Sequence, residues 1–389
     1  MDLAAIQQAL SREELDGWLF FDHHQRDPLA YRVLGFAPGR QVTRRWYYFI
    51  PRQGEPRKLV HRIESDMLAQ LPGSTVAYAS WKEQIAGLER LLEGSRRVAM
   101  QYSPNCAIPY VAMVDAGTVE LVRSLGAEVA SSAGLIQIFE ARWTPAALDS
   151  HLEAGRRVDR IRREAFERIG ARTRSGAAAS ELEIAGFIRD AFASAGLRAE
   201  DGPIVAVNEN AANPHYEPSR EQSREIRGGD LVLIDMWAKL DRPGSVYYDI
   251  TWTGFCGDRP SERMLEVFAI VRGARDAAIA RVQQAASAGR NLAGFEVDDV
   301  ARGYIARHGY AEHFIHRTGH SIGEQVHGAG ANMDNLETYD ERRIIPWTCF
   351  SIEPGIYLDS FGIRSEVNVF VDERSARVTG EIQKALLLL

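Results

Sequence analysis

Residues 231–251, LVLIDMWAKLDRPGSVYYDIT, contain two apolar segments separated by a polar turn with a Pro-Gly pair. β-branched and aromatic residues on both sides of such a turn predict two strands. Each strand carries one carboxylate, Asp235 in the first and Asp249 in the second. Asp is disfavoured in strands, and burying a carboxylate is unfavourable unless a cation or hydrogen bonds compensate it. This segment therefore predicts a buried acidic site.

Three residues further along the chain, one histidine and two glutamates, are also potential metal ligands. His316 and His320 are four apart, but two glycines interrupt a helix there, so a strand or loop with one ligand, His320, is favoured. Glu353 follows a strand-like segment and precedes a Pro-Gly turn, and Glu366 lies in the alternating segment 363–371. Four carboxylates with one imidazole indicate a site for hard divalent cations.

Each candidate alone also has an ordinary structural explanation. Asp235 could end a strand in a turn, and Glu353 could open the turn that follows it. Arg364 lies on the same face as Glu366 and could form a structural salt bridge with it. The specific signal is the joint occurrence of these residues in this order.

The whole chain has the composition of an ordinary soluble protein, with 389 residues, 45% hydrophobic and 25% charged. A net charge of −7 disfavours a nucleic-acid partner. The three cysteines are far apart, so no disulfide framework is expected and a reducing cytoplasm fits. Neither a signal peptide nor an apolar run of the roughly 20 residues that span a bilayer is found. We expect a cytoplasmic protein with no membrane partner.

The pattern along the chain predicts two domains of an α+β protein. Residues 1–140 alternate short strands and helices and carry no recognisable chemistry. Thr144-Pro145 predicts the start of a helix, with Thr as N-cap and Pro in the first position. From there the chain reads as helices, sheet, helices and sheet, with one helical pair at about 261–308. We expect the boundary near 139–144 and the second domain over 145–389.

The chain resembles the superfamily of methionine aminopeptidase, prolidase, aminopeptidase P and creatinase. The resemblance is strong over residues 145–389 and looser over the N-terminal domain, which is similar to that of creatinase and prolidase. It implies a pita-bread catalytic domain with pseudo-symmetric helix/sheet halves, and it favours the proline-peptidase branch over methionine aminopeptidase. The positions that match the family's metal ligands are Asp235, Asp249, His320, Glu353 and Glu366.

By this resemblance the five residues bind two divalent ions, Mn²⁺, Zn²⁺ or Co²⁺, roughly 3.5–4 Å apart. Asp249 and Glu366 bridge the ions, Asp235 completes one of them, and His320 with Glu353 completes the other. A metal-bridging hydroxide then attacks the carbonyl of the Xaa-Pro bond, and Glu353 relays the proton to the leaving nitrogen.

The same matching places four more residues at substrate-handling positions: His215, His316, His327 and Arg364. His327 and His215 are candidate donors to the oxyanion. Arg364 either holds a metal-bridging carboxylate or pairs with the substrate's carboxyl group. Lys239 could contact a substrate carboxylate, and the alternative is a solvated loop residue.

The chain departs from the family pattern around the two aspartates. The family usually has glycine two residues after the first aspartate, where this chain has Trp237. It has Trp252 where many members have arginine, and the segment between the aspartates is longer than usual. We expect the altered turn to narrow the pocket, and both tryptophans to add bulk near the ligands, which favours short substrates.

The resemblance implies a metallopeptidase acting on small peptides with proline in second position, most simply Xaa-Pro dipeptides, as prolidase does. The alternative is aminopeptidase P activity on longer peptides. A metal-free creatinase-like hydrolase or a non-enzymatic binding module would be expected to lack ligands, and all five are present. A homodimer is also implied, in which His23, His24 and Arg26 are candidates to approach the partner's catalytic face; a solvated loop is the alternative.

Overall fold

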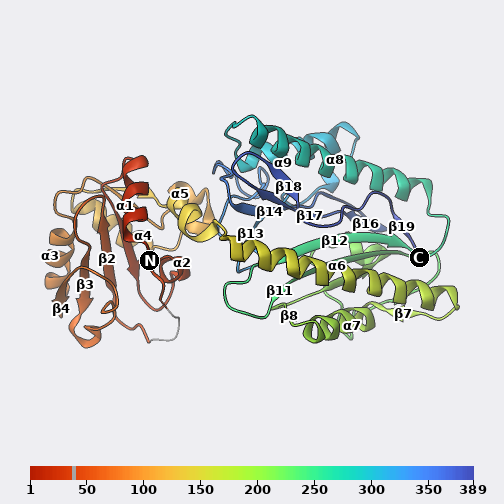
Figure 1. Cartoon of the computed structure of the whole chain (residues 1–389), viewed down its shortest axis with the longest axis horizontal. Helices are drawn as coiled ribbons and strands as arrows, with labels where there is room; N and C mark the ends of the chain where they lie inside the picture. The colour runs from red at the N-terminus through yellow and green to blue at the C-terminus, as the bar shows by residue number, and fades with distance from the viewer. Residues whose placement is uncertain (37–40) are drawn as a thin grey trace. The chain divides into compact units, whose positions relative to one another are not determined.

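A computed structural model describes residues 1–36 and 41–389. The chain divides into two units, Met1–Glu140 and Ala141–Leu389, and Figure 1 labels most of their helices and strands. Among the residues described, none of the helices combines the length with the apolar composition that a bilayer span requires.

The N-terminal unit is built on a six-stranded sheet in the order β4-β3-β2-β1-β5-β6. The sheet is mixed, because β1 pairs antiparallel with β2 and parallel with β5. Every residue of β1 and β2 is buried, and the sequences of both strands are accordingly almost entirely apolar. The strands are β1 Gly17–Asp22, β2 Trp46–Pro51, β3 Arg57–His61, β4 Ser74–Tyr78, β5 Arg97–Met100 and β6 Glu128–Ser131, and the α-helices are α1 Leu3–Arg12, α2 Pro28–Leu34, α3 Trp81–Leu92, α4 Ala116–Ser124 and α5 Ala133–Ile136.

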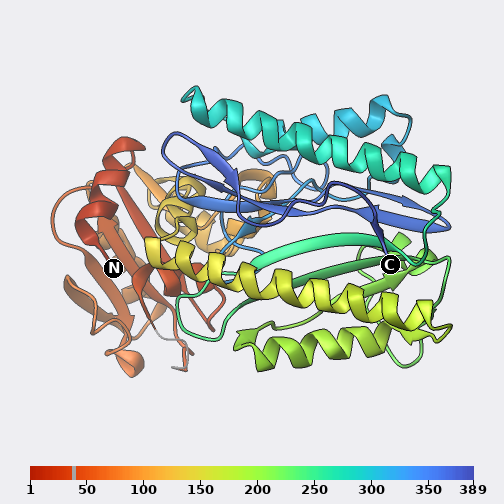
Figure 2. The ribbon, with the colours of Figure 1, turned by 45° about the vertical axis from the view of Figure 1, so that its right-hand side comes forward.

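The second unit contains two helix/sheet halves, as the sequence predicts. In the first half α6 and α7 pack on the sheet β19-β12-β11-β8, and β9 also pairs with β11. In the second half α8 and α9 pack on β13-β14-β17-β18 and on the hairpin β15–β16. Figure 2 shows α6 and α7 along one side of the strands, and α8 and α9 along the other.

The elements of the first half are α6 Pro145–Arg174, β7 Ala179–Ser180, α7 Glu181–Ser194, β8 Leu197–Arg198, β9 Ile204–Val207, β10 Glu225–Ile226, β11 Leu231–Leu240 and β12 Tyr248–Phe255. Those of the second half are α8 Glu262–Ser287, α9 Gly294–Arg307, β13 Ser321–Ile322, β14 Thr348–Ile352, β15 Gly355–Leu358, β16 Phe361–Arg364, β17 Val367–Val371 and β18 Ala376–Val378. The last strand, β19 Leu387–Leu388, returns to the first half and pairs with β12.

Helix α6 begins where the sequence predicts it. The hydroxyl of Thr144 accepts a hydrogen bond from the N–H of Ala147 at 3.1 Å, and Pro145 occupies the first helical position. The helix buries an apolar stripe that includes Val158 and Ile161, both at most 1% exposed, in the core shared with β11 and β12. Burial of this stripe holds the long helix against the strands that carry the two aspartates.

Strands β11 and β12 form the antiparallel pair that residues 231–251 predict. Asp235 lies opposite Thr251, and Trp237 lies opposite Asp249. Directly opposite residues share a face, as do residues two apart on one strand. One face of the pair therefore presents all four of these side chains together.

Trp252 lies on the other face of β12. Its indole packs in the core shared with α6, where the guanidinium carbon of Arg162 lies 3.5 Å from its ring centroid. The expectation that Trp252 adds bulk near the ligands is wrong, because strand alternation turns it toward the helix. Of the two tryptophans, Trp237 shares the face of the aspartates.

His151 ties α6 to the segment before β12 and is fully buried. Its Nδ1–H donates to the carbonyl oxygen of Tyr247 at 2.6 Å, and its Nε2 accepts from the hydroxyl of Thr379 at 2.6 Å. This pairing fits the neutral imidazole, with one nitrogen as donor and the other as acceptor. Burial lowers the pKa of His151 from 6.5 to about 4, so the folded protein keeps this histidine neutral.

Acid should therefore destabilise the second unit through His151. Between pH 6.5 and about 4 the unfolded state binds a proton that the folded state does not, so the free energy of unfolding falls as the pH falls. We expect His151→Gln to reduce this fall by up to about 1.4 kcal/mol per pH unit. Urea unfolding between pH 7.5 and 5, followed by tryptophan fluorescence, measures the slope. Replacing the exposed His308 by Gln is the control, and an unchanged slope in His151→Gln would contradict the prediction.

Candidate metal centre

The structure brings the five predicted ligands together between the two halves of the second unit. Asp235 lies on β11 and Asp249 on β12, whereas the other three lie at strand ends: His320 before β13, Glu353 after β14 and Glu366 before β17. The Nε2 atom of His320 lies 3.4 Å from Asp249 Oδ2 and 3.5 Å from Glu353 Oε1. One ligand atom each from Asp249, His320 and Glu366 lies within 4.8 Å of the others.

Three carboxylate oxygens in this cluster are buried without a hydrogen-bond partner among the residues described: Oδ1 of Asp235, Oδ1 of Asp249 and Oε1 of Glu366. Burial, together with the charge of Asp235, raises the pKa of Asp249 well above its ordinary value. Burial and the charge of Asp249 do the same for the pKa of Glu366. Unpartnered buried carboxylates are strongly unfavourable. A bound cation would remove this penalty, so the donor set fits a metal centre.

His320 is held in the orientation that a metal ligand needs. Its Nδ1–H donates to its neighbour's carbonyl oxygen, Ser321 O, at 3.1 Å, which leaves Nε2 free as a lone-pair donor. Its backbone N–H donates to Ser351 Oγ at 2.9 Å, and that hydroxyl donates to Glu353 Oε1 at 3.0 Å. Gly319 permits this contact, because a Cβ there would lie 1.9 Å from the Ser351 carbonyl oxygen. Burial lowers the pKa of His320, which favours the neutral ligand form.

Arg364 supports Asp235 rather than Glu366. Its Nη2 donates to Asp235 Oδ2 at 2.5 Å and its Nε donates to Thr251 Oγ1 at 3.0 Å. Thr251 in turn donates to Glu366 Oε2 at 2.8 Å. Of the two predicted roles, Arg364 therefore holds a carboxylate in place, but its partner is Asp235 and not one of the two predicted bridging residues.

Tyr357, on β15, is a site residue that the sequence did not indicate. Its hydroxyl accepts from Arg364 Nη1 at 3.0 Å and lies 2.6 Å from His316 Nε2. His316 donates from Nδ1 to the carbonyl oxygen of Arg317 at 2.7 Å, so the tyrosine hydroxyl donates to Nε2. Burial, aided by the charge of Arg364, lowers the pKa of His316 to about 3. Both ring nitrogens of His316 are thus engaged within the protein.

His327 and His215 lie near the histidine ligand. The rings of His327 and His320 meet edge to face, with centroids 4.4 Å apart. The charge of His320, and then burial, lower the pKa of His327 to about 3, and the charge of His215 contributes in the same direction. The neighbour of His215, Tyr216, donates to the buried carboxylate of Glu181 at 2.6 Å, which anchors this loop.

Lys239 belongs to β11 and is not a solvated loop residue. Its Nζ donates to the carbonyl oxygen of Glu324 and lies 4.9 Å from the ring centroid of Tyr247. Burial lowers the pKa of Lys239. Because the ammonium group already contacts Glu324 and Tyr247, a role of Lys239 in binding a substrate carboxylate is not favoured.

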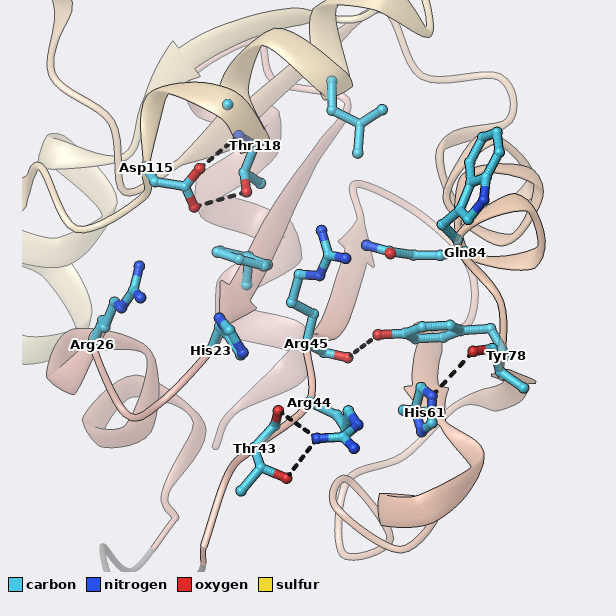
Figure 3. A pocket seen from close by; sticks show the side chains of 15 residues that line it. His23, Arg26, Thr43, Arg44, Arg45, His61, Tyr78, Gln84, Asp115 and Thr118 are labelled. Carbon is cyan, nitrogen blue, oxygen red and sulfur yellow. Dashed lines mark hydrogen bonds between the residues drawn. The ribbon is translucent and has the colours of Figure 1, made fainter.

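In the N-terminal unit the turn with His23, His24 and Arg26 is built on the buried carboxylate of Asp22. Asp22 accepts hydrogen bonds from three backbone N–H groups that follow it, those of residues 25–27. His23 and Arg26 line a cavity of about 680 Å³ together with Arg45, whose side chain extends into it (Figure 3). The approach of these residues to a second subunit stays a prediction.

The fold is that of the pita-bread class, as the resemblance implies, and its donor set fits a metal centre. The chain belongs to metallopeptidase family M24, whose model matches residues 150–373. It is 38% identical over 164 residues to the Xaa-Pro dipeptidase of Lactobacillus helveticus, which covers 42% of this chain and 40% of that protein. The chain spans about half the length of the curated relatives it matches.

Solved structures extend the likeness over the whole chain. Dipeptidase PepE from Mycobacterium ulcerans superimposes with a TM-score of 0.72 at 24% identity, covering 99% of this chain and 96% of that chain. Prolidase from Thermococcus sibiricus superimposes with a TM-score of 0.68 at 24% identity, covering 100% of both chains. At this identity the likeness establishes the shared fold.

Proposed function

We propose that this chain is a dinuclear-metal peptidase that hydrolyses the Xaa-Pro bond, chiefly of dipeptides. The observation that carries the proposal is the convergence of four carboxylates on His320. Three oxygens of these carboxylates have no hydrogen-bond partner among the described residues. The printed name of the Lactobacillus helveticus relative, Xaa-Pro dipeptidase, supports the substrate class.

In this proposal Asp235, Asp249, His320, Glu353 and Glu366 would hold two divalent ions. The oxygen-rich set with one imidazole suits Mn²⁺, Co²⁺ or Zn²⁺. When bound, such ions supply Lewis acidity and lower the pKa of water toward about 7. Arg364 fixes the orientation of Asp235, and Thr251 that of Glu366, through the hydrogen bonds described above.

Glu353 has the surroundings of a proton carrier. Burial raises the pKa of its carboxyl group, and Ser351 Oγ donates to Oε1 at 3.0 Å. A carboxyl with a raised pKa can hold the proton taken from water and pass it to the leaving nitrogen. Proline's imide nitrogen carries no N–H, so the pocket needs no acceptor for it. His327 and His215 are the candidate donors to the developing oxyanion.

The proposal also includes a homodimer in the cytoplasm. The family resemblance supports the dimer. The three cysteines are all free, which supports a reducing compartment.

A metal-reconstitution assay tests the proposed function. We expect protein treated with a chelator to be inactive and Mn²⁺, Co²⁺ or Zn²⁺ to restore hydrolysis of Leu-Pro and Gly-Pro, with Leu-Ala as the control dipeptide. The dipeptides should be preferred over Leu-Pro-Gly by at least about tenfold, or about 1.4 kcal/mol of transition-state binding. Cleavage of the tripeptide alone would indicate aminopeptidase activity instead, and no hydrolysis with any ion would overturn the proposal.

A further inference from the structure

Trp237 places a large aromatic surface beside the metal centre. It is directly opposite Asp249 in the β11–β12 register and two residues from Asp235, so its indole shares their face. It is only partly buried, and it packs against two small apolar clusters, one with Ile204 and Leu233 and one with Tyr247. The indole therefore forms a wall on the face of the ligands, and the residue is partly exposed to solvent.

A carboxylate is held at the edge of this wall. The Nε1–H of Trp237 donates to Asp201 Oδ1 at 2.9 Å. The next residue, Gly202, is so close to the indole that a Cβ would lie 2.6 Å from it. Asp201 itself is exposed, and its partner Trp237 lies on the face of the two ligand aspartates. Asp201 is thus near the metal centre, on the loop between β8 and β9, and open to solvent.

A second loop closes on the same strand pair. Tyr247 donates from its backbone N–H to the carbonyl oxygen of Gly323 at 3.0 Å, and Lys239 Nζ donates to the carbonyl oxygen of Glu324. The first loop thus places Asp201 at Trp237, and the second places the backbone of Glu324 at Lys239. Asp201 is therefore an exposed acidic group bonded to the edge of a partly exposed indole.

We propose that Trp237 and Asp201 together bind a protonated amine of the substrate's first residue. This inference rests on the proposed function and adds the substrate class, Xaa-Pro peptides in which Xaa is Lys or Arg. An indole face attracts a cation placed over it, and a neighbouring carboxylate adds a charge-assisted contact. The α-ammonium group offers the same chemistry as a lysine side chain, and the test separates these two sources.

Asp201→Asn is the central variant. Asparagine has the same shape and can still accept the Trp237 Nε1–H, so the wall stays in place while the charge is lost. Lysine amide and norleucine amide differ only in the terminal ammonium group and contain no bond to proline. Their binding to Mn²⁺-loaded protein, measured by calorimetry, needs no hydrolysis. We expect a roughly fivefold preference for lysine amide, the size of a partly exposed charge pair, and its loss in Asp201→Asn.

Kinetics on Lys-Pro and norleucyl-proline give a second readout in the same variants. Asp241→Asn, an equal charge change in the exposed turn after β11, is the control and should leave both substrates unchanged. Trp237→Phe retains an apolar wall without the N–H, and it should weaken the preference for Lys-Pro through KM more than through kcat.

The outcomes separate this inference from the proposed function. Equal weakening of both amides in Asp201→Asn assigns the amine contact to the α-ammonium group and overturns the preference for Lys or Arg. No change for either amide, or no binding at all, overturns the inference even if Xaa-Pro dipeptides are hydrolysed. A charge-dependent preference in binding without any hydrolysis would leave the inference standing and overturn the proposed function alone.

Discussion

Asp249→Asn is expected to abolish peptide hydrolysis and at the same time to stabilise the metal-free protein. Asp249 is 4% exposed, and its Oδ1 has no partner among the described residues. Asparagine removes a charge that faces Asp235 without changing the shape of the side chain. We expect the free energy of unfolding without metal to rise by about 1–3 kcal/mol, the penalty of a buried group left unsatisfied. Activity should fall by far more than the roughly 10- to 100-fold typical of residues that only support metal ligands.

Urea unfolding with EDTA and with Mn²⁺ measures both effects. In the wild type, metal at 100 times its Kd should add about 2.7 kcal/mol, and in Asp249→Asn this gain should be largely lost. Asp241→Asn serves again as the control, because that carboxylate is exposed. A variant that is less stable than the wild type in EDTA would show that Asp249 is already compensated without a metal, and would contradict the metal-centre assignment.

These opposite effects follow from one property of the centre. Carboxylates that hold two cations must converge, and convergence without cations is unfavourable. The free energy of metal binding therefore also becomes folding free energy. Asp249→Asn would then gain stability without metal and lose activity. Such a trade-off between stability and activity is common at active-site residues.

The two ligand strands could be predicted from the sequence because each aspartate is a charged residue within an apolar segment. A carboxylate in an apolar β-branched segment is a local anomaly, and segment 231–251 contains two of them. Strand alternation also distinguishes the residues of β12. Asp249 and Thr251 are two positions apart and face the site, whereas Trp252 lies on the opposite face of the strand, toward α6.

The supporting contacts could not be predicted, because they join residues far apart in the chain. Tyr357 meets His316 across 41 positions, and Trp237 meets Asp201 across 36. Neither Tyr357 nor Asp201 stands in a segment whose composition is unusual for its element. Which hydroxyl or carboxylate completes a site depends on how segments far apart in the chain pack together, and no local sequence pattern predicts that packing.

Arg364→Met is expected to destabilise the protein, whereas Asp249→Asn should stabilise its metal-free form. We expect a loss of about 3–5 kcal/mol in the free energy of unfolding, as when one partner of a buried ion pair is removed. Arg364 is 3% exposed and donates to Asp235, Thr251 and Tyr357 through three different nitrogens. Methionine fills similar space but leaves Asp235 buried without a counter-charge. Activity should fall by about 10- to 100-fold because the orientation of a ligand carboxylate is lost.

The double variant Arg364→Met with Asp235→Asn decides whether the unpaired charge is the cause. If it is, removing the carboxylate should restore much of the stability in EDTA, and the interaction free energy of the double-mutant cycle should exceed about 1 kcal/mol. Arg364→Lys keeps the charge but can replace only part of the three-way contact, so it should lie between the wild type and Arg364→Met. Arg377→Lys, at a half-exposed ion pair with Asp372, is the matched control and should change stability little. Additive losses in the cycle would mean that Arg364 acts through packing, and that Asp235 does not depend on it.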